Sequence, residues 1–145
     1  MGRILSYRGL LADGGQDRIL LTTKKGEVGY RIIKFQLMAQ NLGSQEYQNV
    51  VKIFKDEQAT ATAAVDFADN RLLAAGYYEG NQATTSANEN LQIIFDQEIF
   101  NQDIFITHKD DDGGQSINYY LEIEAIKLSE HQAMVATLKD IRNSQ

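Results

Sequence analysis

Residues 118–127 read NYYLEIEAIK, and this stretch decides the fold class. Every second position from Tyr119 to Ala125 is apolar or aromatic, while the positions between them carry Tyr120 and two glutamates. Because successive side chains of a strand point to opposite faces, this period of two predicts a half-buried β-strand. After Ala125 the phase changes by one residue, so that Ile126 becomes the apolar position. This change predicts a β-bulge or a bend near Ala125.

The same alternation occurs in residues 33–37, 91–95 and 104–107. Turn-forming clusters of Gly, Asp and Asn separate these stretches. Residues 59–67 are rich in alanine, which favours a helix, but their apolar positions alternate. We therefore expect a strand there, with a helix as the alternative. The pattern predicts about eight or nine short strands in all.

One segment near the C-terminus has helical spacing instead. Ser129 is a good N-cap, and Gln132 three residues later completes a capping box. Apolar residues then follow at intervals of three and four, from Met134 to Ile141. We expect a short α-helix over residues 129–142.

Together these patterns predict an all-β protein: a two-sheet antiparallel sandwich of the jelly-roll type with a short C-terminal α-helix. A chain of 145 residues has room for one core, so we expect a single domain spanning residues 1–145. No segment between the predicted strands has the period of 3.6 residues that a βαβ unit requires.

Composition argues against several classes of protein. The net charge is −6, from 20 acidic and 14 basic residues, which disfavours a surface that follows nucleic-acid phosphates. No apolar run is long enough to cross a bilayer, and residues 1–7 do not resemble a secretion signal. Cysteine is absent, which fits synthesis in a reducing cytoplasm. We expect no nucleic-acid or membrane partner.

The motifs of common enzymes are missing from the sequence. The two histidines, His108 and His131, do not have the spacing of a helical zinc site, and each is best explained as an ordinary surface or satisfied histidine. The serine-nucleophile elbow and the glycine-rich phosphate and dinucleotide loops are also absent. We therefore expect a protein that is not an enzyme and that has no cofactor.

The acidic run Asp110, Asp111 and Asp112, followed by two glycines, has two interpretations. Consecutive carboxylates are ligands that Ca²⁺ prefers. The spacing does not fit an EF-hand, because the fifth position would be Gly114 and the twelfth Leu121. We therefore favour a charged hairpin loop between two strands and keep a calcium site as the alternative.

Two adjacent pairs of tyrosines are candidates for a contact surface. In a strand, each of the pairs 77–78 and 119–120 places one ring inward and one outward. Outward tyrosines are rigid amphipathic anchors that are common at protein interfaces and sugar-binding faces. We select Tyr78 and Tyr120 as the candidate outward rings, with simple packing on the sheet surface as the alternative.

Four segments resemble small structural proteins of marine viruses, largely bacteriophages. They are GYRIIKFQLM (29–38), IFDQEIFNQDIFIT (94–107), NYYLEIE (118–124) and ATLKDIRN (136–143). The resemblance implies a virion component, a capsid-associated or decorating jelly-roll protein made in the host cytoplasm. It carries no catalytic motif over to any residue of this chain.

Two functions follow from these observations. The first is a virion structural protein that associates with itself, as a trimer, pentamer or hexamer, or with other capsid proteins. The second is a carbohydrate- or receptor-binding head that uses the loops at 82–90 and 110–114. A jelly-roll enzyme would need a cluster of histidine ligands that this sequence lacks.

Overall fold

The computed structural model describes residues 3–21, 27–40, 47–81, 88–112 and 114–128. These residues form eight strands: β1 (Arg3–Leu11), β2 (Gln16–Ile19), β3 (Val28–Ala39), β4 (Tyr47–Phe54), β5 (Leu72–Asn81), β6 (Asn88–Phe95), β7 (Ile104–Asp110) and β8 (Ile117–Lys127). All pairings between them are antiparallel. The predicted all-β class is confirmed, whereas the predicted helix at 129–142 lies outside the described residues.

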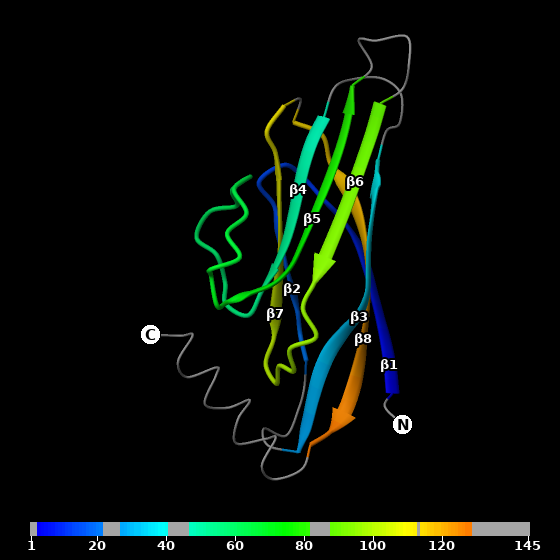
Figure 1. Cartoon of the computed structure of the whole chain (residues 1–145), viewed down its shortest axis with the longest axis vertical. Coiled ribbons are helices and arrows are strands. Elements are labelled where there is room, and N and C mark those ends of the chain that lie inside the picture. Colours follow the sequence, from blue (N-terminus) through cyan, green and yellow to red (C-terminus); the bar gives the residue numbers. More distant parts are fainter. Residues whose placement is uncertain (1–2, 22–26, 41–46, 82–87, 113, 129–145) are drawn as a thin grey trace.

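The strands form two sheets, which are long and narrow in Figure 1. The small sheet has the order β1-β8-β3, and the large sheet has the order β2-β7-β4-β5-β6. Both sheets contribute to one hydrophobic core, in which Leu121 and Ile123 of β8 are buried together with Ile53, Ile104 and Ile106 of the large sheet. The inward and outward positions of β8 alternate as its sequence predicts.

The bulge predicted near Ala125 is wrong in its position. β8 pairs with β3 without a break from Ile123 to Lys127, and the extra residue is Ile33 of β3. Ile126 lies near the end of the sheet, where it is half-buried, so its apolar character does not require a slip in the strand. The bulge at Ile33 allows Ile32 and Phe35, three residues apart, both to point into the core.

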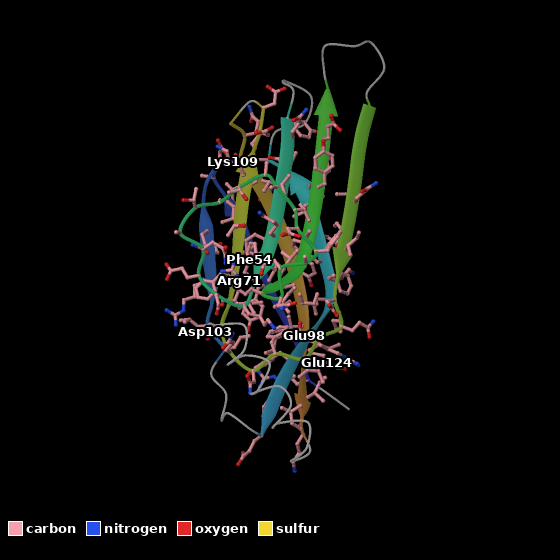
Figure 2. The ribbon with its side chains drawn as sticks, turned by 60° about the vertical axis from the view of Figure 1, so that its left-hand side comes forward. Phe54, Arg71, Glu98, Asp103, Lys109 and Glu124 are labelled. Atoms are coloured by element: carbon pink, nitrogen blue, oxygen red, sulfur yellow. The ribbon has the colours of Figure 1, made fainter. Side chains whose placement is uncertain are left out.

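The strand expected at residues 59–67 is also absent, since this segment belongs to a loop between β4 and β5. Side chains hold the loop in place of a strand partner. The ammonium of Lys52 donates to Thr62 Oγ1 at 2.9 Å and to the carbonyl of Ala64 at 2.6 Å. Phe54 and Arg71 line a small hollow beside it (Figure 2). Backbone groups that find such partners do not need a sheet ladder.

Candidate functional site

A groove of about 800 Å³ crosses the outer side of the small sheet and reaches β6. β3 and β6 lie side by side there (Figure 1), but among the described residues no ladder of hydrogen bonds joins them. The side chains that we use to define this groove are Arg8, Leu10, Gln36, Met38, Leu91 and Tyr120. They come from four strands that are distant in the sequence, so that folding alone brings them together.

Three large apolar side chains in the groove are exposed to solvent. The exposed fraction is 64% for Met38, 50% for Leu91 and 47% for Leu10. Leu10 and Met38 both pair with Asn118, one on each side of β8, which places them on the same face of the sheet. Scattered apolar residues are common on protein surfaces, but several in one concave site mark a contact surface.

Tyr120 lies in the middle of the polar part of this groove. Its neighbours across the sheet are Arg8 on β1 and Gln36 on β3. Its hydroxyl donates a hydrogen bond of 2.8 Å to Glu122 Oε2. That bond and the negative charge of Glu122 raise the pKa of Tyr120. The ring therefore stays neutral at physiological pH, and its role in binding remains a prediction.

Tyr78 was wrongly assigned to the surface, because it is buried in the core. Its ring stacks on Tyr47, with the ring centroids 5.4 Å apart. A Cβ atom at Gly80 would lie 2.3 Å from the Tyr47 ring, so Gly80 leaves the space that this ring occupies. Gly76, Tyr78 and Gly80 are spaced by two residues, so they lie on the same face of the strand. Two glycines on that face indicate that it is closely packed, and our prediction did not use this pattern.

The acidic run does not gather its carboxylates. Asp110 is buried, and its carboxylate accepts hydrogen bonds from the backbone N–H groups of Gln48 at 2.9 Å, Asp112 at 3.0 Å and Gln115 at 2.6 Å. Asp111 and Asp112 are exposed. Within the described part of the chain, no group of three or more His, Cys, Asp or Glu side chains is arranged to hold a metal ion.

The loop that carries this run is not a hairpin, contrary to the prediction. β7 belongs to the large sheet and β8 to the small sheet, so the two strands that flank this run are not paired with each other. Two of the hydrogen bonds to Asp110 satisfy backbone donors of the connection between them, from Asp112 and Gln115, and the third ties it to Gln48 of β4. The physical role of Asp110 is therefore to shape the connection between the sheets.

His108 is a satisfied, fully buried histidine, as one of its two interpretations predicted. Its Nδ1 lies 3.1 Å from the carbonyl oxygens of both Leu11 and Ala12, and its Nε2 lies 2.7 Å from Asn49 Oδ1. Burial lowers the pKa of His108, against the opposing effects of those carbonyls and of two nearby aspartates. The histidine joins β7 to β4 and to the end of β1.

Among the described residues, no helix is long and apolar enough to span a membrane.

No family model matches the chain, and no curated protein matches it. In a comparison with solved structures, the chain is similar to a mitogen derived from Yersinia pseudotuberculosis, with 13% identity over 86% of each chain and a TM-score of 0.34.

Proposed function

We propose that this chain is a structural subunit of a virus particle, a capsid or capsid-decorating protein that binds other subunits through the groove. The observation that carries the proposal is the exposure of Leu10, Met38 and Leu91 in one concave site. An exposed apolar cluster of this kind is stabilised when another protein covers it. Four segments resemble viral structural proteins, and this resemblance is the reason that we propose other capsid subunits as the partner.

The strand order supports a jelly roll as the finer description of the fold. In that fold the first strand pairs with the last, the second with the last but one, and so on inwards. The long hairpin formed in this way wraps into two sheets. The pairs β1·β8, β2·β7 and β4·β5 follow this rule. The remaining pair, β3 and β6, are in contact, although β6 is hydrogen-bonded to β5. Jelly rolls are common in viral capsid and lectin domains.

The chemistry of the groove suits a protein partner. Apolar side chains lie beside the polar groups of Arg8, Gln36 and Tyr120, which resembles the apolar centre and polar rim of protein interfaces. Arg and Tyr are also frequent among the residues that dominate binding energy. In a particle with many copies, each contact can be weak and the whole still stable.

Peptide mapping of purified virions by mass spectrometry tests this proposal directly. We expect peptides of this chain in stoichiometric amounts in particles encoded by the same genome. Particles assembled with the Met38→Lys variant should contain about tenfold less of this chain than particles assembled with the wild type, because the substitution places a charge in the contact. Leu20→Lys, at another exposed leucine outside the groove, is the matched control and should be retained. Absence of the wild-type chain from virions would overturn the proposal.

A second function, binding of a carbohydrate, is favoured by one observation. Tyr120 is flanked across the sheet by a guanidinium and an amide, from Arg8 and Gln36, and this combination suits a sugar ring with its hydroxyl groups. Screening the purified chain against a glycan array separates the two functions. If the chain binds a sugar, the wild type gives a signal on the array. Tyr120→Ala should then abolish that signal, and Leu20→Lys should leave it unchanged. Virion assembly predicts no glycan signal for the wild-type chain.

A further inference from the structure

The loop between β4 and β5, residues 55–71, is long for a connection between neighbouring strands (Figure 1, green loop beside β4). It contains no strand or helix, although the structure describes all of it. Connections of more than about 12–15 residues without secondary structure are uncommon in compact domains, and many of them are functional. Two hydrogen bonds between Gln58 and Gln16 of β2, at 3.0 and 2.9 Å, fix the loop to the large sheet.

A hollow of about 240 Å³ lies between this loop and the strands β4 and β5. Phe54 of β4 and Leu72 of β5 form an apolar part of its wall. The charged side chains that line it are Lys52, Asp66, Asp69 and Arg71. A space of this size accepts a ligand of a few non-hydrogen atoms.

Lys52 brings a buried positive charge to the hollow without a paired acid. Its exposed fraction is 5%, and none of the ion pairs between described residues includes it. Thr62 and Ala64 accept hydrogen bonds from two of the three N–H groups of its ammonium. Asp69 acts on the ammonium electrostatically, but both oxygens of that carboxylate accept hydrogen bonds from Arg71. Since buried charges are normally paired, this ammonium is suited to receive an anion.

A second buried polar group lies next to Lys52. Thr107 of β7 is its direct partner in the register of β4 with β7, so the two side chains are neighbours on the same face of the sheet. Thr107 has an exposed fraction of 1%, and no described residue provides a hydrogen-bond partner for its Oγ1 atom. A buried hydroxyl without a protein partner is commonly satisfied by a water molecule or an ion. This part of the sheet thus has more polar groups than the described residues satisfy.

We propose that the hollow is a binding site for a small carboxylate, whose two oxygens accept hydrogen bonds from the ammonium of Lys52 and the guanidinium of Arg71. The Nε and Nη2 atoms of Arg71 donate to Asp69, at 3.0 and 2.9 Å. The Nη1 atom remains available for a ligand, because a guanidinium has five N–H donors. Hydrogen bonds between charged groups are about twice as strong as those between neutral groups.

The other side chains of the hollow select the kind of anion. Asp66 and Asp69 also line it, and they repel an anion of higher charge such as phosphate. A monovalent carboxylate meets less repulsion, and its alkyl part can contact Phe54 and Leu72. The hollow shares no residue with the groove on the small sheet, so the inference does not depend on the proposed function.

Titration of the full chain with sodium acetate, followed by NMR at constant ionic strength, tests the inference. We expect saturable shifts in the amide signals of residues 59–66, with a dissociation constant on the order of millimolar for so small a ligand. Lys52→Met should raise this constant at least about tenfold. Lys109→Met, which removes the same charge from a more exposed position, should leave it unchanged. Inorganic phosphate should bind more weakly than acetate.

Three results of this titration would overturn the inference. They are the absence of saturable shifts in the wild-type chain, unchanged binding in Lys52→Met, and tighter binding of phosphate than of acetate. Circular dichroism establishes that each variant is folded.

A measurement on the wild-type chain separates the charge of Lys52 from its effect on the loop, since Lys52→Met also removes two hydrogen bonds to the loop. Burial lowers the pKa of Lys52, and a bound carboxylate stabilises the charged form. NMR of the labelled lysine side chains should therefore show a higher pKa for Lys52 in acetate than in chloride at equal ionic strength. The pKa of Lys109 should be the same in both salts. An equal pKa of Lys52 in both salts would contradict direct contact between the ammonium and the carboxylate.

Discussion

At the scale of single residues, His108 is held by a set of contacts that restrict its protonation. Both ring nitrogens face oxygen atoms, and no described residue provides a hydrogen-bond partner for the buried Nδ2 atom of Asn49. A neutral imidazole donates through one nitrogen only. Turning the Asn49 amide lets Nδ2 donate to Nε2, which satisfies both groups with a neutral ring. The lowered pKa of His108, caused first by burial, agrees with that neutral state.

The charge state of His108 predicts how stability depends on pH. The folded state has a pKa below the ordinary 6.5, so the unfolded chain takes up the proton first as the pH falls. The free energy of unfolding contributed by this group is therefore present above about pH 6.5 and is lost below it. We expect urea unfolding to show decreasing stability from pH 7 to pH 5.

Substitution of the histidines identifies the group responsible. His108→Gln should flatten the dependence on pH between 5 and 7, although it also lowers stability by about 1–3 kcal/mol by leaving buried polar groups unpaired. His131→Gln, at the other histidine of the chain, measures that residue's own contribution. An unchanged slope in His108→Gln would show that other groups cause the dependence.

At the scale of elements, the loop between β4 and β5 depends on a buried lysine. The ammonium of Lys52 makes two hydrogen bonds to the loop and lies 5.4 Å from the centre of the Phe54 ring. Burial lowers the pKa of Lys52, while Asp69 acts in the opposite direction. The loop therefore covers the outer side of β4 and shields this charge from water.

Removal of that ammonium should loosen the loop. Lys52→Met keeps the apolar stem but deletes both hydrogen bonds, so we expect faster hydrogen exchange in residues 59–66. The free energy of unfolding should fall by about 1 kcal/mol. Lys109→Met, at a more exposed lysine on β7, is the matched control. Unchanged exchange in residues 59–66 would show that other contacts hold the loop.

At the scale of the whole molecule, a hydrogen bond between two side chains joins the two sheets. The hydroxyl of Tyr119 on β8 donates to Asp17 Oδ2 on β2 at 2.9 Å. Burial and then the Asp17 carboxylate raise the pKa of Tyr119. The adjacent Tyr120 lies on the opposite face and bonds within its own strand. The pair thus provides an internal comparison of an inward and an outward tyrosine.

We expect Tyr119→Phe to destabilise the protein more than Tyr120→Phe. Loss of the bond between the sheets should lower the free energy of unfolding by about 1–2 kcal/mol. The outward substitution should change it by less than about 0.5 kcal/mol. Urea unfolding of both variants measures the difference. Equal effects would mean that the link from Tyr119 to Asp17 contributes little to the packing of the sheets.

Local patterns were sufficient for several strands but insufficient for their exceptions. The alternation of residues 91–95, 104–107 and 118–125 predicted parts of β6, β7 and β8, because a half-buried strand requires that period. The same rule failed at residues 59–67, where the Lys52 ammonium, and not a neighbouring strand, bonds to the Thr62 hydroxyl and the Ala64 carbonyl. The rule also could not decide which of Tyr77 and Tyr78 points inward. That choice depends on the space above Gly80, which the Tyr47 ring occupies where it stacks on Tyr78.

By itself the sequence determined the all-β class, through the alternation that begins in residues 118–127. Only the tertiary structure decided that β7 and β8 belong to different sheets and that Leu10, Met38 and Leu91 share a groove. The physical reason is that a period of two defines a face of a strand but not its neighbour. The neighbour is selected by packing between segments that are far apart in the chain.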